Sequence, residues 1–304
     1  MRVFVTGASG FIGSAVVQEL IGAGHQVLGL TRSDAGAQSL AASGSAVLRG
    51  DVNDLDAVRR AAADSDGVIH LAFNHDFSRF AQNCDDDRRV IAALGDALAG
   101  SDRRLIVTSG TAIANVPPGQ LATEDAPPVP ASVFPRAASE EALDAVTARG
   151  VNASAMRLPQ VHAREAQGLI TYLIRIAREK GTVAYVGDGA NRWPAAHRLD
   201  VARLYRLALE HGTAGTRYNA VAEEGVPARD IAAVIGRRLH APVVSISADE
   251  APAYFGWMAH LAATDMPASS ALTRQRLGWN PTGIGLLDDL EQNAQDLETP
   301  LVAS

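Results

Sequence analysis

The feature that most constrains the fold lies near the start of the chain and reads Thr6-Gly7-Ala8-Ser9-Gly10-Phe11-Ile12-Gly13. It follows an apolar run, residues 3–6, that predicts a strand, and it precedes an apolar pattern of helical period. In such a unit Gly7 allows a tight turn, Gly10 lets the backbone approach a pyrophosphate, and Gly13 lets the helix pack closely on the sheet. The helix N-terminus adds N–H groups and a positive dipole end. The segment therefore predicts a dinucleotide-binding turn.

Short apolar runs alternate with helical patterns over the first 110 residues, and one further unit follows. Nearly continuous apolar runs are typical of parallel strands covered on both faces, and their alternation with helices predicts right-handed crossovers. We expect strands at residues 3–6, 26–30, 46–49, 68–71, 105–108 and 152–157. We expect helices at residues 12–23, 34–42, 54–63, 86–99 and 137–149. The fold class is therefore α/β, with a Rossmann-type doubly wound parallel sheet.

The alternation ends after residue 157. Helical runs at 168–179, 199–210, 228–239 and 286–296 are joined there by short strands and by Pro and Gly. We expect residues 1–160 to form the dinucleotide-binding domain, with strand contributions from later segments. Residues 161–304 are expected to form mainly a smaller, mostly helical substrate-binding lobe.

Composition and charge narrow the range of partners. The chain has 27 Lys and Arg against 34 Asp and Glu, a net charge of −7, which disfavours binding to nucleic acid. The longest apolar runs are too short to span a bilayer, so we expect no membrane insertion. A single cysteine, Cys84, suits a reducing cytoplasm, where we expect the protein to reside. We expect a small-molecule substrate and a monomer or homodimer.

The end of the second expected strand distinguishes two cofactors. NAD-binding proteins usually place Asp or Glu there to bind the ribose 2′-hydroxyl, but this chain has Arg32 and Ser33, with no acid before Asp34. The Arg32 guanidinium suits a 2′-phosphate, and the Ser33 hydroxyl adds a donor. NADP is therefore the expected cofactor, and NAD remains possible.

Further motifs lie in order along the chain and resemble those of the extended short-chain dehydrogenase/reductase family, which includes sugar epimerases, dehydratases and hydroxysteroid dehydrogenases. The matching segments are the glycine-rich turn, Gly50-Asp51-Val52, His70-Leu71-Ala72-Phe73, Thr108-Ser109-Gly110-Thr111, Arg157-Leu158-Pro159-Gln160-Val161-His162, Gly187-Asp188-Gly189, His197-Arg198-Leu199-Asp200-Val201-Ala202 and Leu277-Gly278-Trp279-Asn280-Pro281. With the cofactor argument above, the resemblance implies these cofactor-binding residues: Gly7, Ser9, Gly10, Phe11, Ile12, Gly13, Arg32, Ser33, Asp51, Val52, Leu71, Ala72, Phe73 and Pro159.

One element of that family is missing. Its hydride chemistry uses Tyr-x-x-x-Lys, but the only lysine here is Lys180, and position 176 is Ile. Matching Glu140 to the family's later glutamate puts Ser132 and Arg136 at the Tyr and Lys positions. Arg136 still offers a cation, whereas Ser132 is a poor proton donor. The chain resembles an atypical branch of the family that lacks this pair.

Histidine is the default replacement proton donor, because it titrates near neutrality. His162 is the first candidate and His75 the second, since we expect each to follow a strand at the ligand-binding edge of the sheet. His70 is expected to be a hydrogen-bonded core residue.

Other polar side chains are weaker candidates for the reaction site. Ser109 and Thr111 either hydrogen-bond a substrate carbonyl or cap the strand end. No metal site is expected, and residues 85–87, Asp-Asp-Asp, are interpreted as an N-cap and first helical turn.

These residues favour an NADP-dependent oxidoreductase that transfers hydride to or from a carbonyl or alcohol. Two other functions stay open. One is a catalytically silent NADP-binding sensor or regulator, and the other is a non-redox isomerase or lyase that uses the same pocket.

Overall fold

A computed structural model describes residues 1–292 of the chain. Its centre is a seven-stranded parallel sheet in the order β3-β2-β1-β4-β5-β6-β10. The strands are β1 (Arg2–Thr6), β2 (Gln26–Thr31), β3 (Ala46–Arg49), β4 (Gly67–His70), β5 (Arg104–Gly110), β6 (Asn152–Leu158) and β10 (Arg217–Asn219). The order reverses direction between β1 and β4, which is where open sheets of this kind bind their ligands. The doubly wound α/β fold expected from the sequence is confirmed.

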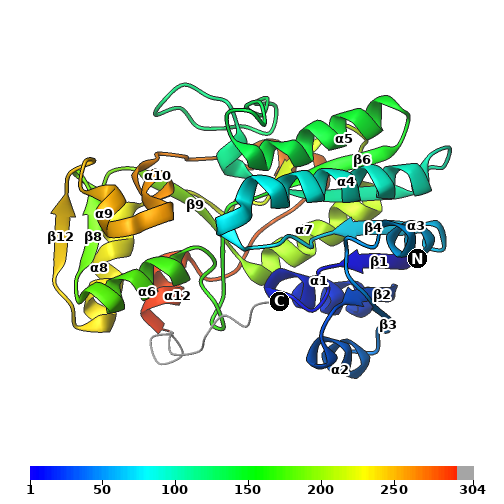
Figure 1. Cartoon of the computed structure of the whole chain (residues 1–304), viewed down its shortest axis with the longest axis horizontal. Helices are drawn as coiled ribbons and strands as arrows, with labels where there is room; N and C mark the ends of the chain where they lie inside the picture. The colour runs from blue at the N-terminus through cyan, green and yellow to red at the C-terminus, as the bar shows by residue number, and fades with distance from the viewer. Residues whose placement is uncertain (293–304) are drawn as a thin grey trace.

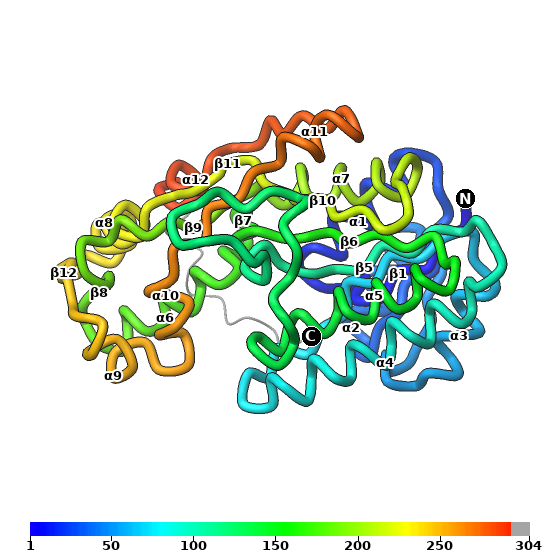
Figure 2. The backbone as a smooth tube through the Cα atoms, turned by 90° about the horizontal axis from the view of Figure 1, so that it is seen from above, coloured from blue at the N-terminus to red at the C-terminus, as the bar shows by residue number. Residues whose placement is uncertain are grey.

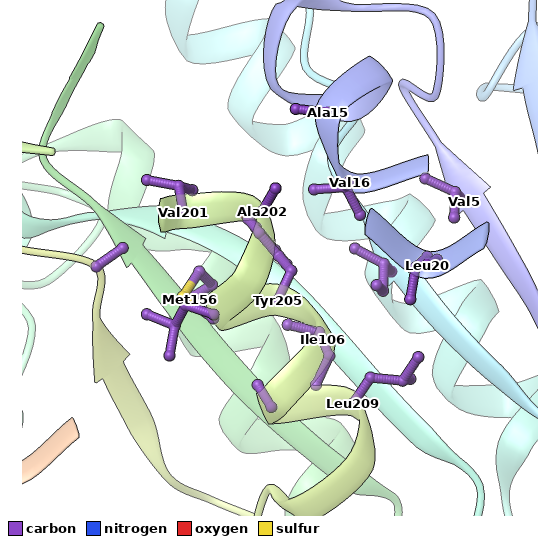
Figure 3. Packing of buried hydrophobic residues seen from close by; sticks show 14 of the residues in the cluster. Val5, Ala15, Val16, Leu20, Ile106, Met156, Val201, Ala202, Tyr205 and Leu209 are labelled. Carbon is purple, nitrogen blue, oxygen red and sulfur yellow. The ribbon is translucent and has the colours of Figure 1, made fainter. Parts of the chain in front are cut away.

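Helices cover both faces of the sheet (Figure 1). They are α1 (Phe11–Gly22), α2 (Asp34–Ala42), α3 (Leu55–Ala63), α4 (Phe80–Leu98), α5 (Ala138–Ala148) and α7 (Arg198–His211). Successive residues of β1 point to opposite faces: Val3 and Val5 pack with α1 and α7, while Phe4 packs with α3, α4 and α5. Figure 3 shows the first of these layers, in which Tyr205 and Leu209 of α7 lie over β5 and beside α1.

The remaining elements build a second lobe, on the left of Figure 1. Its strands are β7 (Gln160–His162), β9 (Arg192–His197) and β11 (Glu223–Pro227) in one sheet, and β8 (Val183–Val186) and β12 (Val243–Ile246) in another. Its helices are α6 (Ile170–Lys180), α8 (Ala228–Leu239), α9 (Ala251–Phe255), α10 (Ala259–Ala263) and α12 (Leu286–Gln292), and α11 (Ala271–Leu277) runs back along the sheet domain (Figure 2). Four 3₁₀ turns complete the described chain: η1 (Phe77–Arg79), η2 (Thr111–Ile113), η3 (Pro135–Ala137) and η4 (Gly256–Met258).

Most predicted strands and helices agree with the structure to within one or two residues, and the exceptions are informative. The helix expected at 86–99 begins at Phe80, so residues 85–87 lie inside α4 and do not cap it. The stretch 160–162, expected as a loop, is the short strand β7, paired with β9. The last predicted helix, 286–296, is described only as far as Gln292, and its remainder lies outside the described residues.

Candidate functional site

The glycine-rich turn has the geometry that its sequence predicts. Gly7 has φ +65°, and a Cβ there would lie 2.8 Å from the Ala72 backbone nitrogen. A Cβ at Gly13 would lie 2.0 Å from the Gly7 carbonyl oxygen, so α1 packs against the turn at a distance that only glycine permits. A Cβ built on Gly10 would have one atom within 4 Å, apart from its chain neighbours, and that atom is the Gly7 carbonyl oxygen at 3.2 Å. Gly7 and Gly13 are therefore fixed by the protein, whereas a Cβ at Gly10 would meet one backbone oxygen at a tight but less severe distance.

The N-terminus of α1 is available to an anion. Gly10 is its N-cap and provides no side-chain hydrogen bond to the first turn. Backbone N–H groups at such a helix start carry partial positive charge and suit a phosphate. Ser9, Phe11 and Ile12 are half-buried around the turn. The lack of a side chain at Gly10 and the uncapped helix start together fit a dinucleotide pyrophosphate.

The carboxyl end of β2 carries the residues expected to select the cofactor. Ser33 is the N-cap of α2, and its Oγ accepts a hydrogen bond from the Gly36 backbone N–H at 3.0 Å, which leaves the hydroxyl proton free to be donated. Arg32 Nη1 lies 3.8 Å from Asp51 Oδ2, and both side chains are about half exposed. A guanidinium and a hydroxyl donor therefore lie at one helix start, beside the Asp51 carboxylate.

Other residues expected at the cofactor lie along the same edge of the sheet. Leu71, Ala72 and Phe73 follow β4, and the Leu71 and Ala72 backbone N–H groups donate to Thr6 Oγ1, each at 3.2 Å. Val52 follows β3, and Pro159 lies between β6 and β7. All are partly accessible to solvent.

A buried hydrogen-bond chain begins beneath the glycine turn. Thr6 Oγ1 accepts two backbone N–H bonds, so its own proton goes to His70 Nδ1, 2.7 Å away. With Nδ1 accepting from Thr6, Nε2 is the donor of the ring and donates to Asp87 Oδ1 at 2.9 Å. His70 is 2% exposed, which agrees with its predicted place in the core.

The same carboxylate holds Arg136. Arg136 Nη1 donates to Asp87 Oδ2 at 3.0 Å and to Ser139 Oγ, and Nη2 donates to the Thr108 carbonyl oxygen at 2.8 Å. Burial alone would raise the pKa of Asp87, but the Arg136 charge and the His70 hydrogen bond lower it below its usual value. The guanidinium also lies 4.4 Å above the Phe73 ring. Arg136 is therefore a fixed cation at the carboxyl ends of β4 and β5.

Asp87 is the residue of this site that the sequence reasoning missed. It belongs to the run at 85–87 that was interpreted as a helix cap, yet it is 6% exposed and partners two sequence candidates, His70 and Arg136. Helical spacing carried the missed signal, because Asp87 lies three residues before Val90 and four before Ile91, on the buried face of α4.

The hydroxyl candidates differ in their surroundings. Ser109 is 4% exposed, and its Oγ has no hydrogen-bond partner within residues 1–292. Thr111 is also buried, and its Oγ1 donates weakly to the Leu158 carbonyl oxygen at 3.4 Å. Ser132 is exposed in the turn before η3. Of the two buried hydroxyls, that of Ser109 is the one that lacks a partner there.

His75 lies in the loop after β4, as expected. Its ring packs edge-on against Phe73 at 5.4 Å and against Phe77 at 6.1 Å, while part of the residue faces solvent. Desolvation by these neighbours, and then the charge of Arg136, lower the pKa of His75 below 6.5. His75 is exposed in this loop, and the Arg136 cation lies near its imidazole.

The expectation that His162 lies on a ligand-facing loop is wrong. It belongs to β7, is completely buried, and places Nδ1 2.7 Å from Asp289 Oδ2. Its ring meets that of His197, the N-cap of α7, at 5.7 Å. Burial and the nearby His162 lower the pKa of His197. This cluster joins β7 and α12 of the lobe to the start of α7.

Two negative findings concern the described part of the chain. No helix within residues 1–292 is long and apolar enough to cross a membrane. Over the same range, His, Cys, Asp and Glu side chains do not gather in groups of three or more that could hold a metal ion.

Comparison with known proteins assigns the family. A family model described as the NAD dependent epimerase/dehydratase family matches residues 3–220. The chain belongs to this epimerase/dehydratase family. An uncharacterized protein of Schizosaccharomyces pombe is 48% identical over 97% of this chain and 99% of its own length. A 2-alkyl-3-oxoalkanoate reductase of Stenotrophomonas maltophilia is 29% identical over 76% of this chain and 73% of its own.

A solved structure supports the fold of this family member. The dTDP-glucose 4,6-dehydratase DesIV of Streptomyces venezuelae, solved with NAD bound, superposes with a TM-score of 0.78. It is 20% identical in sequence, and the match covers 97% of this chain and 96% of that one. The family model confirms the resemblance to the NAD-dependent epimerase/dehydratase family, and the sequence contains no Tyr-x-x-x-Lys.

Proposed function

We propose that the protein is an NADP-dependent oxidoreductase that interconverts an alcohol and its carbonyl compound. The observation that carries this proposal is the position of His75 in the loop after β4, at the carboxyl edge of the sheet where Asp87 holds the Arg136 cation. When bound, the nicotinamide cofactor takes a hydride from the alcohol carbon or returns it to the carbonyl carbon. The relative named as an oxoalkanoate reductase supports the reaction class.

The pyrophosphate is assigned to the turn at Gly10 and the start of α1, and the absence of a side chain at Gly10 and of a side-chain cap on the helix supports this. The 2′-phosphate of NADP fits Arg32 and Ser33, which supply a cation and a hydroxyl proton where an NAD-binding protein usually has an acid. DesIV binds NAD, so the choice between NAD and NADP rests on these two residues.

The proton is assigned to His75. In alcohol oxidation the substrate hydroxyl gives its proton to the neutral imidazole while the C–H bond breaks and the C=O bond forms. In carbonyl reduction the imidazolium returns this proton to the oxygen. Ser109 is suited to hydrogen-bond the substrate oxygen, because its hydroxyl is otherwise unpartnered within residues 1–292. Arg136 stays charged throughout, because Asp87 balances it.

The test combines cofactor binding with turnover. Melting temperature should rise more with NADPH than with NADH at equal concentration, because a ligand that binds the native state stabilises it by mass action. Absorbance at the reduced-nicotinamide band should then fall when NADPH and a panel of carbonyl compounds are added together. Tight NADPH binding without turnover of any carbonyl or alcohol would refute the enzyme and favour the sensor.

A further inference from the structure

An unusual group of rings lies where the two lobes meet. We call it the aromatic cluster, and it consists of Phe73, His75, Phe77, Phe80, Phe134, Tyr172 and Trp257. The sheet domain contributes five of these rings, those of Phe73, His75, Phe77, Phe80 and Phe134. The lobe contributes Tyr172 of α6 and Trp257 of η4. The central contact is between the lobes: the Phe77 and Trp257 rings stack at 4.0 Å with an angle of 14°.

The aromatic cluster lies at the edge of the hydrophobic cores, with Tyr172 packed against that of the lobe. The chain is poor in aromatic residues, with 7 Phe, 5 Tyr and 3 Trp, and six of these belong to the cluster. None of the six is buried, and Trp257 is 43% exposed. The other two tryptophans, Trp193 and Trp279, are at most 4% exposed. Partly exposed rings gathered in one place are typical of a surface that binds an apolar ligand.

The cluster is continuous with the proposed reaction centre. Phe73 follows Ala72, whose backbone nitrogen touches the glycine turn, and it stacks with the Arg136 guanidinium. His75 contacts both Phe73 and Phe77, and Phe77 contacts Trp257. A molecule whose carbonyl group reaches His75 therefore lays its remainder along Phe77 and Trp257.

Charge at the cluster disfavours a strongly anionic ligand. The Arg136 guanidinium on Phe73 is neutralised by Asp87 at 3.0 Å. The Arg175 guanidinium lies 5.2 Å from the centre of the Tyr172 ring and 3.8 Å from the Glu179 carboxylate. Both cations that stack on cluster rings thus already face carboxylates, and a diphosphate would compete with them.

We propose that the aromatic cluster selects the substrate, and that the substrate is an uncharged carbonyl compound with an aromatic or bulky apolar substituent, in place of a sugar nucleotide. This inference rests on the proposed oxidoreductase function and adds its substrate class. Phe77, Tyr172 and Trp257 are its specificity-determining residues.

Trp257 gives a direct binding signal, because the other two tryptophans are buried. We would titrate the protein, saturated with NADP⁺, with 4-phenyl-2-butanone or with UDP-glucose and record tryptophan fluorescence. The ketone should give a saturable change that is absent in Trp257→Phe, and UDP-glucose should give none. A saturable change with UDP-glucose and none with the ketone would overturn the proposal.

Variants separate ring contacts from general effects on folding. Phe77→Leu and Tyr172→Leu keep apolar volume but lose the ring, and each should weaken ketone binding about tenfold, measured by thermal shift. Val243→Ala, on β12 at the far end of the lobe, should leave it unchanged. Unchanged affinity in both ring variants would also refute the proposal.

Turnover measured alongside distinguishes this inference from the function on which it rests. Ketone binding through Trp257 without NADPH oxidation would refute the oxidoreductase and leave the ligand class standing. If a ketone oxidises NADPH and neither ring variant changes this activity, the oxidoreductase function stands and the proposed role of the aromatic cluster is refuted.

Discussion

Replacing Asp87 by Asn tests the buried network most directly. Three donors converge on this carboxylate: His70 Nε2, Arg136 Nη1 and Ser139 Oγ. An amide of the same shape must turn its NH₂ group toward at least one of them, so a hydrogen bond is lost and Arg136 loses its counter-charge. Removing one partner of a buried pair costs about 3–5 kcal/mol. Because Arg136 retains 14% exposure, we expect the lower end, about 3 kcal/mol.

The assay is urea and thermal unfolding of Asp87→Asn beside Asp56→Asn. Asp56 is 78% exposed in its pair with Arg59, so its replacement should cost less than about 0.5 kcal/mol. Asp87→Asn should lower the melting temperature by roughly 6–12 °C. A loss no larger than that of Asp56→Asn would refute the reasoning.

The pH dependence of Asp87→Asn has a defined sign. The pKa of Asp87 is lower in the folded than in the unfolded chain, so its carboxylate stabilises the fold above the unfolded pKa, about 3.9. This contribution is lost as pH falls through the folded value. The difference in stability between wild type and Asp87→Asn should therefore be full at pH 7 and shrink in acid. A difference that stays constant below about pH 4 would contradict the assignment.

Three further predictions concern the proposed reaction. Gly10→Val should abolish NADP(H) binding measured by calorimetry and leave a folded protein, because Gly10 has an ordinary φ of −77° and a Cβ there meets only the Gly7 carbonyl oxygen; normal binding would show that the turn is only structural. Arg32→Ala should weaken NADP(H) about tenfold and NAD(H) little, and equal weakening of both would contradict the 2′-phosphate assignment. His75→Ala should lower kcat by ~10²-fold with cofactor affinity unchanged, and wild-type alcohol oxidation should rise with pH through a value below 6.5. Loss of activity in Ser132→Ala but not in His75→Ala would make the histidine assignment wrong.

The sheet was predictable because its strands carry local signals. Continuous apolar runs marked β1 to β6, and the glycine spacing placed the turn and α1 correctly. The short strand β7 had no such signal, since it pairs with β9 more than thirty residues later, Val161 opposite Ala196. That pairing buries His162, and its partner Asp289 lies 127 residues away in the sequence. Proximity of this kind depends on tertiary packing, which local periodicity does not contain.

The site was predictable only in part, for a related reason. Positions relative to the motifs identified Arg32, His75 and Arg136. They did not reveal the hydrogen bonds, ion pairs and ring contacts that these side chains make. Asp87 was hidden because three adjacent aspartates resemble a helix start, whereas α4 begins at Phe80, directly after η1. The aromatic cluster was equally hidden, because its rings come from four separate stretches of the chain and meet only in the folded protein.

The position of α7 and β10 in the chain has a consequence for synthesis. Both complete the sheet domain, yet they follow β7, α6, β8 and β9 of the lobe. In the folded chain α7 covers Val3, Val5 and Ile106. When only the first 160 residues have left the ribosome, this apolar face of the sheet is therefore exposed to solvent. The nascent chain must wait for residue 219 before the sheet closes, and a fragment cut at residue 160 should aggregate.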